Sequence, residues 1–202
     1  MDGIYSRNTG GYSVIATNAC SRLQGGVALC WRENDRFVVE EQRTLGANVI
    51  TCQMVTGHGR YYLIGCYLPP SDTTVADDME KAIEACPRTC TPLLLGDLNI
   101  NFEHPRDPRD EKVAEILDAY DFLDTTRCFR QHCQYNAKGR WTWRQRWEGR
   151  WISSQPDYLM GRRKIRRRLR KVGLRFPRHH DSDHRAIVLE CMWKRYYRKG
   201  MV

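Results

Sequence analysis

Polar side chains that can carry out acid–base chemistry stand where apolar, strand-like runs of the sequence begin or end. They are Asp97, Asn99, Asp157, Asp183 and His184. Carboxylates bind divalent cations, and an imidazole that titrates near neutral pH transfers protons. Because side chains at i and i+2 of an extended chain point the same way, Asp97 and Asn99 are expected to face one cleft.

Each of these acids also has an ordinary structural explanation. Asp and Asn are common in turns after strands, where their side chains bond to nearby backbone, and that explanation is favoured for Asp97 and Asn99 taken alone. Three such sites in one small domain favour a shared functional cleft instead. An acid hydrogen-bonded to His184 would fix the tautomer of its ring, and Asp157 is the candidate.

Two β-hairpins are predicted upstream of these residues. One pairs residues 27–31 with 36–40, and the other pairs residues 49–55 with 61–68. The second hairpin should end at Pro69-Pro70, because proline cannot extend a strand ladder.

Helices and further strands follow the hairpins. A helix over 75–86 is expected after the capping residues Ser71-Asp72, and apolar residues at helical spacing predict another over 110–120. Residues 92–96 and 186–192 should be strands, the first buried on both faces. Strands with interspersed helices predict a mixed α/β or α+β layered fold.

The net charge of +9 comes from one segment. Residues 160–179 contain ten of the 33 Lys and Arg and no acid, so the rest of the chain has 23 bases against 24 acids. Such a segment indicates a polyanionic partner such as nucleic acid, with a solvated loop or a nuclear import signal as the alternatives. It lies between Asp157 and Asp183 in the sequence and is therefore expected to edge the substrate cleft.

Nine cysteines are an odd number without the spacing of a disulfide framework. Cys30, Cys52 and Cys66 lie in apolar runs and are expected in the core. Two sets resemble zinc ligands but lack the close-spaced pair of a usual finger: Cys86 with Cys90, and Cys128 with His132 and Cys133. A reducing compartment is the simpler account. No apolar run approaches a membrane span. We expect an intracellular, nuclear protein with no membrane partner and no disulfide-linked partner.

Short segments along the whole chain form a recognisable combination. They are Gly25-Gly26-Val27-Ala28, Tyr67 before Pro69-Pro70, Gly96-Asp97-Leu98-Asn99, Trp141-Thr142-Trp143, Pro156-Asp157-Tyr158 and Ser182-Asp183-His184. In this order they resemble the endonuclease/exonuclease/phosphatase superfamily, which includes deoxyribonuclease I. Within it, the chain is most similar to the endonuclease domain of non-LTR (LINE-type) retrotransposons. The resemblance implies one domain over residues 1–202, a four-layer sandwich of two mixed β-sheets flanked by helices.

The resemblance also implies a function, Mg²⁺-dependent (or Mn²⁺-dependent) nicking of DNA that leaves a 3′-hydroxyl and a 5′-phosphate. Asp97 would align or deprotonate the attacking water, Asn99 would orient the phosphate, and Tyr67 would contact it. His184 would transfer a proton or stabilise the phosphate while Asp157 holds its ring. Asp183 would help to bind the metal ion.

The chain departs from the family pattern at its start. The family has a strand with an Asn and another ending in a metal-binding Glu before the segment that matches Gly25-Gly26, and the first 24 residues here contain no Glu. The family pattern therefore predicts a domain without its first two strands, an incomplete set of metal ligands and impaired cleavage.

Arginines alternate with tryptophans over residues 140–151. Trp143 is expected in the core, whereas the arginines are expected to be exposed to nucleic acid. The predicted nucleic-acid contacts are Arg144, Arg146, Arg162, Arg163, Arg166 and Arg167. Two alternatives stay open: a phosphatase of a small phosphorylated substrate such as a phosphoinositide, and a non-catalytic remnant that only binds nucleic acid.

Overall fold

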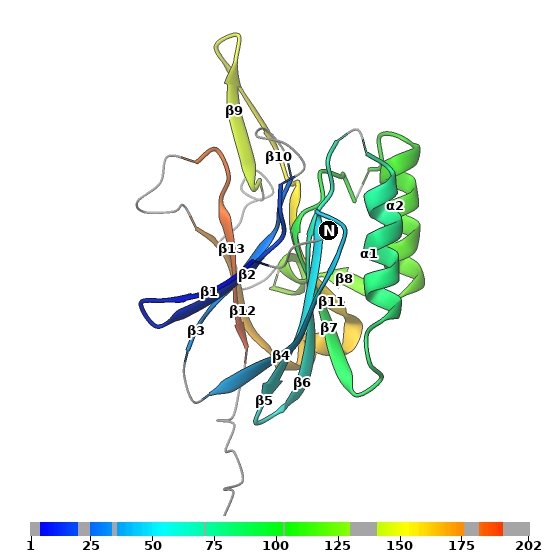
Figure 1. Ribbon diagram of the computed structural model, residues 1–202. Coiled ribbons are helices and arrows are strands. Elements are labelled where there is room, and N and C mark those ends of the chain that lie inside the picture. Colours follow the sequence, from blue (N-terminus) through cyan, green and yellow to red (C-terminus); the bar gives the residue numbers. More distant parts are fainter. Residues whose placement is uncertain are drawn as a thin grey trace, which may run out of the picture. The chain divides into compact units, whose positions relative to one another are not determined.

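The computed structural model describes residues 5–19, 25–33, 36–70, 72–102, 104–129, 141–175 and 182–191. Their fold is the predicted mixed α/β class, with strands in several sheets and few helices (Figure 1). The chain divides into two compact units, one up to Leu94 and a second beginning at Leu95. Each unit is described by itself, and the single domain over residues 1–202 stays a prediction.

The first unit contains two groups of strands. One is a three-stranded sheet of β1 (Tyr5–Thr9), β2 (Tyr12–Ala16) and β3 (Ala28–Arg32). The other runs in the order β4 (Phe37–Leu45), β5 (Val49–Thr56), β6 (Gly59–Tyr67) and the start of β7 (Cys90–Asp97). β5 and β6 form the predicted hairpin, with Thr56 opposite Gly59, and their ladder stops before Pro69-Pro70 as expected.

The hairpin predicted between 27–31 and 36–40 is wrong. β3 pairs with β2, with Ala28 opposite Ala16, whereas β4 pairs with β5 in another sheet. Gly10 and Gly11 have positive φ angles of 58° and 79° and close the tight turn that brings β1 back to β2. The N-terminal hairpin of β1 and β2 therefore provides the strand that pairs with β3. This pairing could not be predicted from which strands are neighbours in the sequence.

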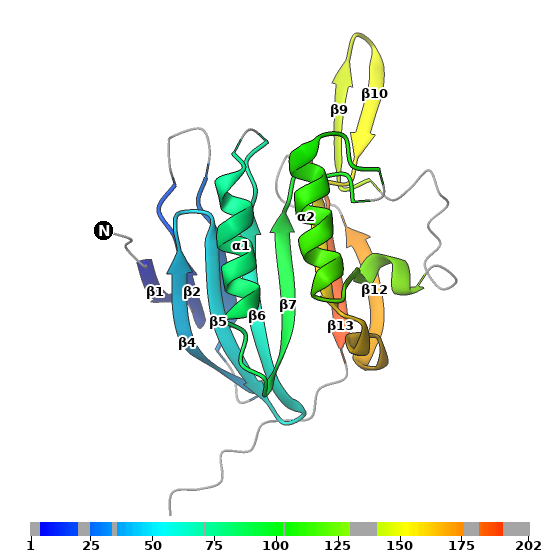
Figure 2. The ribbon, with the colours of Figure 1, turned by 90° about the vertical axis from the view of Figure 1, so that its right-hand side faces the viewer.

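Helix α1 (Thr74–Glu84) covers β5 and β6 in the first unit, as Figure 2 shows. Its apolar face of Val75, Ala76, Met79, Ala82 and Ile83 is buried, which explains why the segment is helical. Of the two predicted capping residues, Ser71 lies outside the described residues, and Asp72 comes just before the N-cap residue Thr73. The Asp72 carboxylate accepts hydrogen bonds from the N–H and the hydroxyl of Thr74 in the first turn.

The second unit contains the rest of β7 and the elements that follow it. They are α2 (Pro108–Ala119), β8 (Phe122–Asp124), the 3₁₀ helix η1 (Thr125–Phe129), β9 (Trp143–Trp147), β10 (Arg150–Ser154), β11 (Asp157–Arg162), the 3₁₀ helix η3 (Arg163–Arg168), β12 (Leu169–Arg175) and β13 (Ala186–Cys191). Strand β11 lies between β7 and β8, β9 pairs with β10, and β12 pairs with β13. The predicted helix over 110–120 and the strands over 92–96 and 186–192 are confirmed over the residues described.

The cysteine predictions hold in part. Cys52 and Cys66 are buried as expected, and burial raises the pKa of Cys52 to about 12. Cys30 is exposed, because its side chain lies on the outer face of β3 while that of Leu29 is buried. His132 and Cys133 lie outside the described residues. None of the helices in the described part of the chain has the length and apolar character needed to cross a membrane.

Candidate active site

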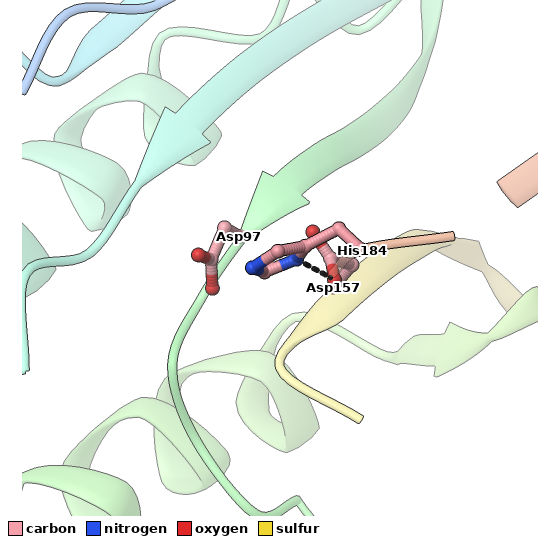
Figure 3. A group of neighbouring side chains, drawn as sticks. All are labelled: Asp97, Asp157 and His184. Atoms are coloured by element: carbon pink, nitrogen blue, oxygen red, sulfur yellow. Dashed lines mark hydrogen bonds and ion pairs between the residues drawn. The ribbon is translucent and has the colours of Figure 1, made fainter. Parts of the chain in front are cut away.

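Three of the predicted residues come together in the second unit. One ligand atom each from Asp97, Asp157 and His184 lies within 4.8 Å of the others, and all three side chains are partly buried. Figure 3 shows Asp97 at the end of β7 facing the imidazole ring, with Asp157 on the other side of that ring. Asp157 Oδ2 lies 2.8 Å from His184 Nδ1, so an Nδ1–H donated to the carboxylate leaves Nε2 for other chemistry.

Asp97 lies where β7 ends and the chain turns. Gly96 has a φ of 144° and Asn99 a φ of 48°, conformations that Gly and Asn tolerate. Asp97 Oδ1 also accepts a hydrogen bond of 3.0 Å from the Asn99 N–H, so the carboxylate stabilises the turn as well as facing the site. Burial raises the pKa of Asp97, and the negative charge of Asp157 raises it further.

Two buried charged residues of α2 hold the loop that carries Asn99. The Arg109 guanidinium donates to the carbonyl oxygens of Leu98 (3.2 Å) and Asn99 (2.6 Å). Asp110 is fully buried, and its Oδ2 accepts from the N–H groups of Asn101 and Arg106. The sequence does not reveal these contacts, because charged residues in an amphipathic helix are usually exposed.

We expect Asp110→Asn to lower the free energy of unfolding by about 2–3 kcal/mol at neutral pH, because buried donors lose a charged acceptor. Burial alone would raise the pKa of Asp110, but hydrogen bonds from Asn101 and Arg106 and the charge of Arg106 lower it overall. A lowered carboxyl pKa stabilises the fold above about pH 4 and loses this contribution as the pH falls through the folded-state value. Urea unfolding at pH 7 and in acid should therefore show a difference that shrinks in acid. Asp118→Asn, at an exposed position of the same helix, is the control. Equal losses for both variants would contradict this account.

Thr142 fixes the geometry around Asp157 and His184. Its buried hydroxyl accepts a hydrogen bond of 3.1 Å from the Asp157 N–H, and its carbonyl accepts one of 2.6 Å from the Arg185 N–H. The next residue, Trp143, forms an isolated β-bridge with His184. The Thr142 segment thus links the start of β11 to the residues before β13.

Asp183 takes no part in the three-residue group. It is exposed, and its Oδ2 accepts a hydrogen bond of 2.7 Å from the Trp143 indole N–H. Trp143 is only partly buried, so the prediction that it belongs to the core is wrong, and Thr142 occupies the buried position. The Trp143 indole instead orients the carboxylate next to His184, and metal binding by Asp183 stays a prediction.

Tyr67 belongs to the first unit, at the end of β6. It is partly buried, and its N–H donates to the carbonyl oxygen of Asn48 at 2.9 Å. Its predicted contact with a phosphate stays a prediction.

The chemistry of the donors fits a divalent cation. Two carboxylates and an imidazole suit Mg²⁺ through oxygen and Mn²⁺ through oxygen and nitrogen. Within the described residues, this is the group in which three or more His, Cys, Asp or Glu side chains come close enough to share an ion. The number of ligands left for a cation is small, because the Asp157 carboxylate is already hydrogen-bonded to the His184 imidazole.

The β9–β10 hairpin is anchored beside the site and carries exposed aromatic and basic residues. The Arg144 N–H donates to the Asp183 carbonyl oxygen at 3.0 Å, and the Arg144 guanidinium lies 4.0 Å from the Trp151 ring centre. Trp147 and Trp151 are each 60% exposed, and Arg146 is exposed beside them. The hairpin projects at one end of this unit (Figure 2). Its turn at Glu148 and Gly149 has φ angles of 45° and 77°.

The other predicted nucleic-acid contacts lie elsewhere in this unit. Arg162 is the last residue of β11, at the end distant from Asp157, and Arg163, Arg166 and Arg167 follow it in η3. All four line a separate pocket. These arginines lie a strand length from Asp157, and the prediction that the basic segment edges the substrate cleft stays a prediction. The segment follows β11 away from the site and returns along β12, where Arg175 lies opposite Ala186.

Several solved structures match this chain in fold. The endonuclease domain of TRAS1, a telomere-specific non-LTR retrotransposon, matches with a TM-score of 0.69 and 14% identity over 91% of this chain and 81% of that one. The 3′-5′ exonuclease NExo from Neisseria meningitidis gives a TM-score of 0.65 and 16% identity over 91% and 80%. An AP endonuclease from Archaeoglobus fulgidus matches with a TM-score of 0.64 and 14% identity, over 90% of this chain and 79% of that one.

These likenesses identify a fold. No protein-family model matches the sequence, and no curated protein matches it either. The sequence identities are low, so the structures establish a common architecture rather than a common activity. The chain has the deoxyribonuclease I-like fold that its motifs predicted.

Proposed function

We propose that this chain, which has the fold of deoxyribonuclease I-like enzymes, hydrolyses phosphodiester bonds of DNA at Asp97, Asp157 and His184. The observation that carries the proposal is the 2.8 Å contact between Asp157 and His184 within 4.8 Å of Asp97. A carboxylate that orients an imidazole, opposite a second carboxylate, is an arrangement for moving protons on both sides of a reacting phosphate. Structures of similar fold are those of an endonuclease and an exonuclease by their own names.

Each residue has a distinct role in this proposal. Asp97 accepts a proton from the attacking water, and its raised pKa makes it a better base. As the bond from phosphorus to the 3′ oxygen breaks, His184 Nε2 donates a proton to the phosphate or the leaving oxygen. Asp157 keeps Nδ1 protonated and the ring in place. The Asn99 side chain orients the phosphate. The products are a 3′-hydroxyl and a 5′-phosphate.

A divalent cation, Mg²⁺ or Mn²⁺, belongs to the same proposal. From the family resemblance, Asp183 would help to hold it beside the phosphate. When bound, it would neutralise negative charge on the phosphoryl oxygens. Since the group has few ligands, we expect weak metal binding and slow cleavage that needs millimolar metal.

The β9–β10 hairpin contacts DNA next to the scissile phosphate in this proposal. Exposed tryptophans stack on bases or sugars, and Arg144 and Arg146 approach phosphates.

We expect Trp147→Ala with Trp151→Ala to weaken DNA binding about 10-fold while the rate at saturating DNA stays unchanged. Fluorescence anisotropy with a labelled duplex measures the affinity. Ile152→Ala, an apolar residue 48% exposed on the same hairpin, is the control, and an equal loss for it would contradict base stacking.

The retrotransposon origin rests on the family resemblance and on the likeness to the TRAS1 endonuclease domain. It suits an enzyme that nicks chromosomal DNA, and nuclear localisation belongs to the same proposal. A nuclear import signal within the basic segment 160–179 would serve that localisation.

A panel of substrates tests the proposed function against its two alternatives. Purified protein is incubated with supercoiled plasmid, with a soluble inositol polyphosphate and with a phosphoinositide, each over a titration of Mg²⁺. The proposal predicts nicked plasmid in the presence of metal and no release of inorganic phosphate from the other two substrates. Phosphate release without nicking would favour a phosphatase. Salt-dependent DNA binding without any turnover would favour the non-catalytic remnant.

A further inference from the structure

A basic pocket lies at the end of β11 opposite the candidate active site. Its volume is about 700 Å³, and its lining consists of Asp121, Arg162, Arg163, Lys164, Arg166 and Arg167. Strand β11 begins with Asp157 and ends with Arg162. At ~3.3 Å per residue, the two ends of the strand are roughly 17 Å apart. The pocket is therefore separate from the Asp97, Asp157 and His184 group.

The 3₁₀ helix η3 presents the cations in rows. Residues at i and i+3 eclipse in a 3₁₀ helix, so Arg163 stands over Arg166 and Lys164 stands over Arg167. The third row contains Ile165, which is 1% exposed and anchors the helix to the core. The other four side chains are exposed. Arg168 shares the row of Ile165 and is partly buried, so the two other rows turn their positive charge toward solvent.

Asp121 fixes one side of this pocket. Its carboxylate lies 3.0 Å from Arg163 Nε, and its carbonyl oxygen accepts a hydrogen bond of 3.2 Å from the Arg163 N–H. Among the described residues that line the pocket, Asp121 is the one carboxylate, against five cations. Because the Asp121 carboxylate is paired with Arg163, the other four cations of the pocket are left as an excess of positive charge. The backbone hydrogen bond from Arg163 to Asp121 holds the start of η3 in place.

We propose that this pocket binds the phosphate backbone of a nucleic-acid strand at a second site, apart from the active site. Arginine guanidinium groups donate two parallel hydrogen bonds to phosphate oxygens, and four of the five cations are arginines. Rows of charge along a helix suit a linear, repeating polyanion. The proposal concerns binding and holds whether or not the Asp97 group cleaves DNA.

The surroundings of η3 favour nucleic acid over a lipid surface. Helices that lie on membranes bury large apolar side chains in the lipid beside their basic face. Among the described residues, the exposed large apolar side chains are Tyr12, Trp147, Trp151 and Ile152, and none belongs to η3. The apolar residue of η3, Ile165, faces the core instead.

The test compares two double variants that remove the same charge from the same basic segment. Arg166→Gln with Arg167→Gln removes two cations from the pocket. Arg170→Gln with Lys171→Gln removes two exposed cations of β12 that do not line it. Affinity for a fluorescein-labelled duplex of about two helical turns is measured by anisotropy over a series of salt concentrations.

The pocket variant should bind the duplex about 10-fold more weakly near 0.1 M salt, and the slope of log K against log salt should fall in magnitude by about two. The β12 variant should change affinity less than about twofold. Equal losses in the two variants, or no loss in the pocket variant, would overturn the proposal. Absence of nicking in every protein would count against the proposed function alone.

Discussion

Replacing His184 by Ala is expected to lower the single-turnover rate of plasmid nicking by about 1000-fold. The imidazole is positioned to transfer a proton, and general acid–base catalysis by one side chain typically contributes 10²–10⁴-fold, roughly. DNA affinity should stay within about twofold, because the β9–β10 hairpin and the basic pocket are unchanged. Quench-flow or timed gel assays at saturating protein measure the rate.

Asp157 provides the control for this result, because it acts through His184. Asp157→Asn keeps the shape of the side chain but weakens the 2.8 Å contact that fixes the tautomer of the ring. A loss of about 100-fold is expected, and the double variant should be no slower than His184→Ala alone. Multiplied losses in the double variant would show that Asp157 and His184 do not act as a unit.

Replacing Asp97 by Asn should have an effect of similar size, a loss of about 1000-fold in nicking rate. The amide can still accept the hydrogen bond from the Asn99 N–H, so the turn after β7 is kept while the base is removed. Because burial and the neighbouring Asp157 both disfavour the charged carboxylate, the neutral amide should leave the thermal stability unchanged or slightly higher.

Three readouts make this prediction specific. Thermal melting shows whether the variant is folded, anisotropy shows whether it binds DNA, and the nicking rate shows the chemistry. Asp118→Asn removes one carboxylate from an exposed position and serves as the matched control. A folded Asp97→Asn variant that nicks at the rate of the parent chain would remove Asp97 from the mechanism.

The grouping of Asp97, Asp157 and His184 could be predicted from the sequence for a physical reason. Asp97 ends β7 and Asp157 begins β11, and these two strands share one sheet. His184 comes before β13 of another sheet and reaches the same place through its bridge to Trp143. The local interpretation of Asp97 was also correct, since its carboxylate accepts a hydrogen bond within the turn. Structural and chemical roles therefore coexist in one residue.

Other features depend on contacts that no local pattern contains. β3 and β4 are neighbours in the sequence, yet they pair with β2 and β5 in different sheets. From the sequence, Arg109 and Asp110 would be predicted to be exposed on their helix. They are buried instead, because backbone groups of the loop after β7 need polar partners. Hydrogen bonds of this kind, between a loop and a helix, can be identified only from the three-dimensional structure.

The placement of the basic segment 160–179 also could not be predicted from the sequence alone. Its charges are continuous in the sequence, but β11 and β12 separate them along the second unit. Arg175 lies opposite Ala186, next to the residues after His184, whereas Arg166 and Arg167 line the pocket at the distant end of β11. Charge composition predicted a polyanionic partner, and only the strand topology divides the segment into two places.

The central claim is that Asp97, Asp157 and His184 form a site for metal-dependent hydrolysis of DNA. The most direct measurement is the nicking of supercoiled plasmid in Mg²⁺ by the purified chain, with the nicked ends probed by polymerase extension. The account predicts nicks with extendable 3′-hydroxyl ends that disappear with EDTA and in His184→Ala. Nicking that persists at the same rate in both Asp97→Asn and His184→Ala would contradict it.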